Sequence, residues 1–596
     1  MSKISPIEWD LSDLYKSISD PQITKDKNKT KKLVKLFTES YKGKINKQGI
    51  TAKKLTQAIG ELEGIFSLIY KYGIYSSLIK SKDTSSETIA AFAQGIDEFI
   101  NEQANQLLFF ELELVQIPQK KIKDMLKDKA LSEYKHYIEH ELIFKPYRLN
   151  ESEEIVMSKK AQTGSSAFVR LFNELNSNLK YELTVDGKIK ELTYAELVPY
   201  LSNHPDRKLR QKAAESMSAS LKDNSKLFAF ILNTLLLDKK NNDEIRNYDY
   251  QEQSTYLGYQ VDKEVVDKMV KVISSKYTIS EKFYLHKKNV LGLKELYEWD
   301  RYSKVIDVED TKYTWEESQE MVLDAFKEFS EEFYEIAKLF FDNKWIDAKV
   351  TKGKVAGAFC SLGLPDTHPY ILLNFTGQLR DILTLAHELG HGIHAYMSRG
   401  QKLFQFWPST AVAEIASVFC ESIVFDKLIN QIESKEQKAE LLGDKIQDIF
   451  ATIFRQTSFH LFEQDIHRAR REEGELSIDR FGELFQNRLQ EMFGTGLKLT
   501  DGHKNWWMPV GHFYNYNFYV FTYAFGETLA TSLFAKYKKE GSKMVKQYTS
   551  ALSQGGNRTP LELTEIMGAD VKHKDFWING LNLIDAYVTE FIELTK

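Results

Sequence analysis

Cysteine, long apolar runs and strong net charge are all scarce in this sequence, and each shortage excludes a class of protein. Two cysteines in 596 residues cannot build the disulfide framework of a small secreted domain. The longest apolar stretch, residues 227–237, is interrupted by Asn233 and Thr234 and is too short to span a bilayer. No apolar run follows the opening residues, so we expect no secretory signal, no membrane partner and a cytoplasmic location.

Charge of one sign is also lacking. The formal net charge is -5 for the whole chain, and lysine-rich stretches such as residues 25–35 are interspersed with polar side chains, which is typical of a solvated helix face. Nucleic-acid binding usually requires a basic patch or stripe, so we expect no nucleic-acid partner. The sequence does not indicate an oligomeric state.

Helix-breaking residues are few, with 11 Pro and 30 Gly, and the long stretches between them favour helices. Apolar residues such as Leu55, Ile59 and Leu62 recur at helical spacing. A β-hairpin is predicted at residues 181–192 and a small β element at residues 354–375. The sequence therefore predicts a mainly α fold with a little β.

The length of the chain indicates more than one lobe, because a single hydrophobic core rarely grows this large. The predicted hairpin interrupts the helical pattern and suggests a boundary close to it. We expect an N-terminal helical lobe at residues 1–195 and a catalytic region at residues 196–596.

A short histidine-glutamate motif is the most informative feature of the sequence. His387 and His391 are four residues apart, so on a helix both imidazoles leave the same face and can meet one zinc ion. Glu388 is rotated by about 100° from His387, beside the ion, where a general base is needed. Asp381 is expected to cap the start of this helix. His394 lies about 10 Å further along the axis than His387, so we expect it to pack or to hydrogen-bond instead of binding the same ion.

A second helix, expected to start at Ser409, supplies a third ligand. Glu414, Ser417 and Glu421 form one polar stripe on an otherwise apolar helix, and burying bare carboxylates is expensive unless they face a metal, a partner charge or water. We assign Glu414 as the third ligand and Glu421 as a partner that orients a ligand imidazole. A chance occurrence of the histidine motif on a surface or core helix remains the alternative.

A third cluster, at residues 511–523, is rich in aromatic side chains. Tyr516, Tyr519 and Tyr523 recur at helical spacing and are predicted to share one helix face, with His512 just upstream. Phenol or imidazole donors beside a metal can stabilise the oxyanion that forms when an amide is hydrolysed. Spacing alone leaves open the alternative that these rings form an aromatic core face.

These motifs resemble the thimet oligopeptidase and oligoendopeptidase F family of zinc peptidases. The resemblance rests on the segments 387–394 and 414–421, favours the oligoendopeptidase F branch, and extends to the segments 9–15, 168–175 and 555–563. It implies a two-lobed, largely helical fold with a deep, enclosed channel that admits only short or unfolded peptides.

The resemblance also implies the roles of the site residues. One zinc ion per chain would be held by His387, His391 and Glu414, with Glu388 as the base. His512 and a tyrosine would assist the oxyanion, and we rank Tyr519 and Tyr523 above Tyr516.

An endopeptidase that acts on oligopeptides is the leading function. An exopeptidase with the same zinc chemistry is one alternative, and it would need a pocket for a peptide terminus that the sequence cannot show. A non-catalytic peptide-binding protein with a vestigial motif is another. The intact Glu388 argues against the last, because a binding protein has no need of a base between two ligands.

Overall fold

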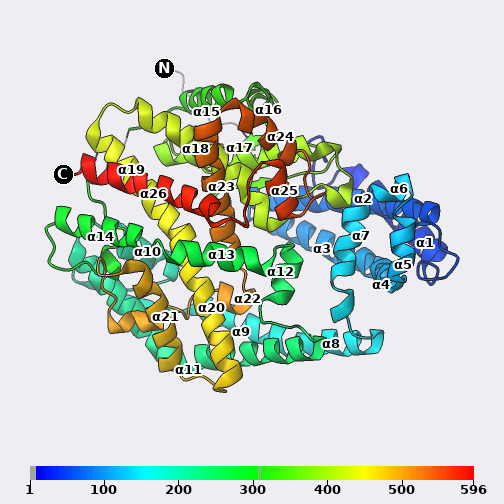
Figure 1. Cartoon of the computed structure of the whole chain (residues 1–596), viewed down its shortest axis with the longest axis horizontal. Coiled ribbons are helices and arrows are strands. Elements are labelled where there is room, and N and C mark those ends of the chain that lie inside the picture. Colours follow the sequence, from blue (N-terminus) through cyan, green and yellow to red (C-terminus); the bar gives the residue numbers. More distant parts are fainter. Residues whose placement is uncertain (1–7, 307, 309–310) are drawn as a thin grey trace. The chain divides into compact units, whose positions relative to one another are not determined.

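The structure is a computed structural model that describes residues 8–306, 308 and 311–596. Helices make up most of these residues (Figure 1). The strands form two small sheets. The predicted mainly α fold is confirmed. Across the described ranges, no helix is both long enough and apolar enough to cross a membrane.

The chain divides into two compact units, each assembled from separate stretches. Unit 1 comprises Met1–Pro146, Asp310–Lys427 and Lys536–Ala569, and unit 2 comprises Tyr147–Glu309, Leu428–Ala535 and Asp570–Lys596. The predicted division into residues 1–195 and 196–596 differs from these units. The hairpin that suggested the boundary lies inside unit 2, where its first strand packs against a long helix. Packing between segments distant in sequence decides this division, and local patterning does not show such packing.

Unit 1 joins the N-terminal helices to the helices and strands that surround the predicted metal site. Its elements are α1 (Pro21–Tyr41), α2 (Ala52–Lys82), α3 (Glu87–Leu107), α4 (Phe109–Gln116), α5 (Gln119–Met125), α6 (Lys129–Ser132), α7 (Lys135–Ile143), α15 (Trp315–Phe329), α16 (Glu331–Asp342), β3 (Ile346–Asp347), β4 (Phe359–Ser361), β5 (Tyr370–Leu372), α17 (Leu379–Met397), η3 (Ser398–Gly400), η4 (Leu403–Gln405), most of α18 (Thr410–Gln431), α24 (Ser542–Leu552) and α25 (Pro560–Ile566). A 3-10 turn, η1 (Lys145–Tyr147), follows α7.

The core of unit 1 fixes the sheet that lies beside α17. The predicted apolar face of α2 is buried, with Leu55, Ile59 and Leu62 at most 2% exposed. Tyr370 and Leu372 of β5 belong to the same hydrophobic cluster as these side chains. The sheet has the order β3-β5-β4, with β3 parallel and β4 antiparallel to β5. The N-terminal helices thus anchor the strand that supports the helix of the predicted metal site.

Unit 2 is built around a long helix and also contains the predicted hairpin. Its elements are α8 (Glu151–Thr163), α9 (Ser165–Asn178), β1 (Tyr181–Val185), β2 (Lys188–Leu192), α10 (Tyr194–Ser202), α11 (Arg207–Arg246), α12 (Gln253–Tyr259), α13 (Lys263–Ser274), α14 (Thr278–Val290), η2 (Glu298–Asp300), α19 (Lys435–Ile449), the π-helical turn η5 (Phe450–Phe454), α20 (Arg455–Glu472), α21 (Ile478–Phe493), η6 (Asp501–Asn505), α22 (His512–Asn515), most of α23 (Phe521–Glu540) and α26 (Lys574–Leu594). Asp186 and Gly187 connect the paired strands with positive φ angles, as a tight hairpin turn requires.

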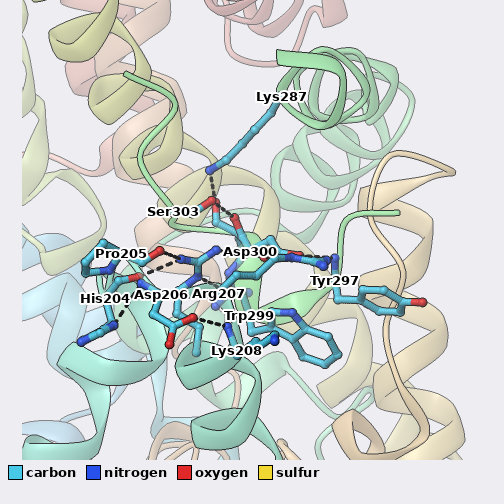
Figure 2. Close-up of polar contacts among 12 residues, drawn as sticks. His204, Pro205, Asp206, Arg207, Lys208, Lys287, Tyr297, Trp299, Asp300 and Ser303 are labelled. Atoms are coloured by element: carbon cyan, nitrogen blue, oxygen red, sulfur yellow. Dashed lines mark hydrogen bonds and ion pairs between the residues drawn. The ribbon is translucent and has the colours of Figure 1, made fainter. Parts of the chain in front are cut away.

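A buried ion cluster ties the start of α11 to η2 and α14 (Figure 2). The Asp300 carboxylate is fully buried and accepts hydrogen bonds from Arg207 at 2.7 and 2.9 Å and from Arg210 at 3.1 Å. The buried Lys287 amine donates to the Arg301 carbonyl at 2.7 Å and to Gln447 Oε1 at 3.0 Å. Both arginines pair with the Asp300 carboxylate, whereas the Lys287 amine donates to neutral acceptors.

Lys287 is expected to make the stability of unit 2 depend on pH. Burial lowers the pKa of Lys287 to about 7, against a partial opposing effect of Asp300, whereas an unfolded lysine titrates near 10.4. Between these values the unfolded chain binds a proton that the folded chain lacks. The free energy of unfolding is therefore highest above the pKa of the unfolded lysine. It falls by about 1 kcal/mol per pH unit as the pH drops toward 7.

The variant Lys287→Met removes this contribution. The melting temperature of the variant minus that of the wild type is expected to fall by a few °C from pH 7 to pH 9. Lys282→Met is the control, because Lys282 lies on the same helix and its side chain is 41% exposed. A constant difference between wild type and Lys287→Met over this pH range would contradict the prediction.

Candidate active site

Helix α17 carries the predicted histidine ligands, and Asp381 helps to cap its start. Gln378 occupies the N-cap, and Asp381 lies three residues further on. The Asp381 carboxylate accepts backbone N–H groups from Gln378 at 3.1 Å and Thr376 at 2.7 Å. Asp381 therefore caps the helix start as predicted, from the third residue of the helix and as the partner of Gln378 in a capping box. Its carboxylate accepts hydrogen bonds from backbone N–H groups at the helix start.

A glycine between the two histidines lets α18 approach α17 closely. A Cβ atom at Gly390 would lie 2.5 Å from the Ala416 carbonyl oxygen and 2.6 Å from Ser417 Cα, so no other residue fits there without moving α18. This contact holds the backbone around Glu414 against the helix that carries the histidines. Sequence reasoning missed Gly390, although a glycine inside a strong helical motif is a signal of close packing.

The structure brings the three predicted metal ligands together. One ligand atom from each of His387, His391 and Glu414 lies within 4.8 Å of the other two. Glu414 Oε2 is 3.4 Å from His387 Nε2 and 3.6 Å from His391 Nε2. The two imidazole rings are nearly perpendicular, with centroids 5.1 Å apart.

This arrangement fits a zinc ion. Distances of 3.4 and 3.6 Å are longer than ordinary hydrogen bonds. Two ligand atoms that each lie about 2.1 Å from a tetrahedral ion are about 3.4 Å apart, which matches the observed spacing. Two imidazole nitrogens and one carboxylate oxygen are also a typical ligand set of catalytic zinc sites, in which a fourth position stays open.

Two side chains on α18 hold the ligands in place. Glu421 Oε2 lies 3.1 Å from His387 Nδ1, so this ring nitrogen carries the proton and Nε2 is free to bind a metal. Ser417 Oγ donates to Glu414 Oε2 at 2.6 Å. The stripe of Glu414, Ser417 and Glu421 therefore faces the histidines as a single polar surface.

Glu388 lies beside the three ligands in a buried position. Glu388 is only 6% exposed. Burial raises the pKa of Glu388 to about 7, the nearby His387 opposes this rise, and the charges of Glu414 and Glu421 add to it. A carboxylate with a pKa in this range can take up a proton near neutral pH, as a general base must.

His394 and the two cysteines of unit 1 lie outside the ligand cluster. His394 is 4% exposed, and burial lowers its pKa to about 3, which agrees with a packing role. Cys360 and Cys420 are free thiols. Burial raises the pKa of both, and the charge of Glu388 contributes at Cys360, so Cys360 lies close to the candidate base.

The aromatic cluster of unit 2 differs from the predicted single helix face. Tyr523 lies on α23, but Tyr516 and Tyr519 lie in the non-helical segment 516–520 between α22 and α23. Phe518 in this segment has a φ of 55°, which interrupts the helix. The expectation of three phenols on one helix was therefore wrong.

Three of the four predicted side chains of this cluster lie together, and Tyr516 joins them through the Tyr519 ring at a centroid distance of 5.6 Å. His512 Nε2 and the Tyr523 hydroxyl are 3.2 Å apart. The Tyr519 ring lies parallel to the His512 ring at a centroid distance of 6.0 Å and edge-on to the Tyr523 ring at 5.3 Å. These three residues are partly exposed, whereas Tyr516 is 62% exposed. Their partial exposure disfavours a purely structural aromatic core.

The family models and known proteins that match this chain are peptidases. A family model described as Peptidase family M3 matches residues 200–583, and one described as Oligopeptidase F matches residues 113–181. Oligopeptidase PepF from Bacillus subtilis is 27% identical over 578 residues, which cover 94% of this chain and 83% of that protein. An oligoendopeptidase F homolog from Borreliella burgdorferi is 27% identical over 592 residues, covering 98% of this chain and 97% of that protein.

Solved structures share the fold. Oligoendopeptidase-F from Enterococcus faecium superposes with a TM-score of 0.72 at 20% identity, covering 96% of this chain and 99% of that chain. A candidate peptidase from Chlamydophila abortus superposes with a TM-score of 0.86 at 23% identity, covering 98% of both chains. Both candidate ligand helices, α17 and α18, lie within the region matched by the first family model.

Proposed function

The chain belongs to peptidase family M3, and we propose that it is a zinc-dependent endopeptidase that hydrolyses internal bonds of short oligopeptides. One observation carries this proposal above all others. The ligand atoms of His387, His391 and Glu414 lie within 4.8 Å of one another, with the buried Glu388 beside them. The oligoendopeptidase F relatives support the same activity.

The ligand residues have distinct tasks. His387, His391 and Glu414 would hold one zinc ion and leave one position open toward the substrate. A bound zinc ion would polarise the scissile carbonyl and lower the pKa of the attacking water. Glu421 keeps the His387 imidazole in the tautomer that can bind, and Ser417 holds the Glu414 carboxylate.

Glu388 is proposed to move the proton. As general base it would take a proton from the attacking water and then deliver it to the leaving amine. The burial of Glu388 supports this role, because a carboxylate away from bulk water both holds a proton readily and keeps its orientation. A peptide-binding protein without activity would gain nothing from a buried carboxylate at this position.

His512, Tyr519 and Tyr523 are proposed to stabilise the oxyanion of the reaction. Their hydroxyl and imidazole groups are hydrogen-bond donors, and His512 and Tyr523 already lie within hydrogen-bond distance of each other. Removing one donor of this kind typically lowers kcat by about 10²–10³-fold. The family resemblance implies His512 and one tyrosine of this cluster in this role, with Tyr519 and Tyr523 ranked above Tyr516.

Short, flexible peptides are the expected substrates. The test uses one internally quenched peptide with both termini blocked, offered free and also embedded in the middle of a long, permanently unfolded polypeptide. We expect internal cleavage of the free peptide and much slower cleavage of the same bond when it is embedded, because a site that is enclosed excludes long chains. Equal rates would contradict size selection, and cleavage only after unblocking a terminus would indicate an exopeptidase.

A further inference from the structure

The segment 516–520, which carries Tyr519, contains an unfavourable backbone conformation. The φ of Phe518 is 55°, in the left-handed region that residues with side chains seldom adopt. Such a conformation persists only where the surrounding structure enforces it, and it is frequently found at functional sites. The contacts of Phe518 show what enforces it.

Phe518 is held from inside unit 2 by its ring and by its backbone. The ring is fully buried and lies 4.4 Å from the His467 ring of α20, centroid to centroid. The Phe518 N–H donates to Glu463 Oε1 at 2.8 Å, also from α20. A second hydrogen bond to this segment comes from α12, where Thr255 Oγ1 donates to the Asn517 carbonyl at 3.0 Å.

Glu463 is an unusual partner for a single backbone N–H. Its residue is 1% exposed, and burial raises its pKa well above the usual range, with the charge of Glu252 adding to the effect. Its Oε2 atom has no hydrogen-bond partner among the described residues. Burying a carboxyl group is costly. A buried carboxyl group that accepts a hydrogen bond from this strained turn therefore indicates that the turn has to keep its conformation.

The turn decides where Tyr519 lies. Because Phe518 directs its ring inward, the next residue leaves the turn with its own ring parallel to His512 and edge-on to Tyr523. The Tyr519 carbonyl then accepts the Thr522 N–H at 3.0 Å at the start of α23. The turn at Phe518 thus fixes the positions of both Tyr519 and the first turn of α23.

We propose that Glu463 is a positioning residue, whose buried carboxyl holds the Phe518 N–H and thereby fixes Tyr519 beside His512 and Tyr523. This inference rests on the proposed role of Tyr519 as an oxyanion donor. Glu463 itself lies behind the turn and acts through Tyr519.

The experiment compares Glu463→Gln with Glu463→Leu in the full-length, zinc-loaded protein. Gln keeps an acceptor oxygen for the Phe518 N–H, whereas Leu has a similar volume and no acceptor. Hydrogen exchange of the segment 512–520 is expected to accelerate at least about tenfold in the Leu variant and to stay unchanged in the Gln variant. The kcat for the quenched peptide is expected to fall about 10–100-fold in the Leu variant with KM nearly unchanged, and to be restored by Gln.

A double-mutant cycle with Tyr519→Phe separates positioning from general damage. If Glu463 acts through Tyr519, Glu463→Leu should reduce kcat little further once the Tyr519 hydroxyl is gone. Fully additive losses, or unchanged exchange of the segment in Glu463→Leu, would overturn the inference. A fully active Tyr519→Phe would instead remove the proposed donor role of Tyr519, whatever the exchange of the segment shows.

Glu298→Leu is the matched control. Glu298 is also buried in unit 2, at 5% exposed, and its carboxylate accepts the Thr500 N–H at 3.1 Å as well as the Thr500 hydroxyl. Its loss removes the same kind of bond from a different turn. We expect this control to lower the melting temperature while leaving kcat and the exchange of the segment 512–520 unchanged, and an equal loss of kcat in both Leu variants would overturn the positioning role.

Discussion

Glu388→Gln is expected to abolish peptide turnover while the protein keeps its zinc. Glutamine has nearly the same shape and leaves His387, His391 and Glu414 untouched, but it cannot accept a proton from the attacking water. Loss of a general base typically lowers kcat by about 10²–10⁴-fold. The measurement is kcat for the quenched peptide at saturating concentration, together with the zinc content of the same preparation.

A shorter acid provides a control for this prediction. Glu388→Asp keeps a carboxylate but withdraws it by one methylene group, so we expect activity between that of the wild type and that of Glu388→Gln. If Glu388→Gln retained most of the wild-type activity with normal zinc content, the assignment of Glu388 as the base would be wrong. Loss of zinc in Glu388→Gln would instead show that Glu388 helps to bind the metal.

Glu414→Ala is expected to lose most of its bound zinc, because one of three protein ligands is removed. Glu421→Ala should be milder, because Glu421 contacts the His387 imidazole and does not lie among the ligand atoms. Losses of about 10–100-fold in zinc affinity or activity are typical for a residue of this kind. Zinc affinity is measured by competition with a chelator, and kcat is measured with zinc in excess.

The helix that carries both carboxylates also offers a matched control. Asp426 lies on α18 and pairs with Lys538 Nζ at 2.7 Å, outside the ligand cluster. Asp426→Ala removes a carboxylate from the same helix and should leave zinc affinity unchanged. Equal losses of zinc in Glu414→Ala and Glu421→Ala, or the reverse order, would move the third ligand to Glu421.

The cluster of His387, His391 and Glu414 could be predicted from the sequence because it depends on helix geometry. The spacing of His387 and His391 fixes the direction of both imidazoles within one helix. The stripe of Glu414, Ser417 and Glu421 likewise follows from the period of a helix, and the structure places it against the histidines. What the spacing did not reveal is how closely the two helices pack, which depends on Gly390.

The tyrosine cluster could not be predicted in detail, for a physical reason. Tyr516, Tyr519 and Tyr523 have the spacing of a helix face, but the left-handed backbone of Phe518 breaks the helix between them. That conformation depends on Glu463, which lies 55 residues earlier in the chain. The two compact units were hidden for the same reason, because each is assembled from stretches that are distant in sequence.

Zinc occupancy measured against activity tests the central claim most directly. Zinc per chain is measured by elemental analysis while a chelator removes the metal and added zinc restores it, and the hydrolysis rate of the blocked, internally quenched peptide is followed in the same samples. We predict one zinc ion per chain at full activity, a rate that falls in proportion to the zinc removed, and recovery when zinc is returned. Undiminished cleavage by protein stripped of zinc and other divalent metals would contradict a zinc peptidase centred on His387, His391 and Glu414.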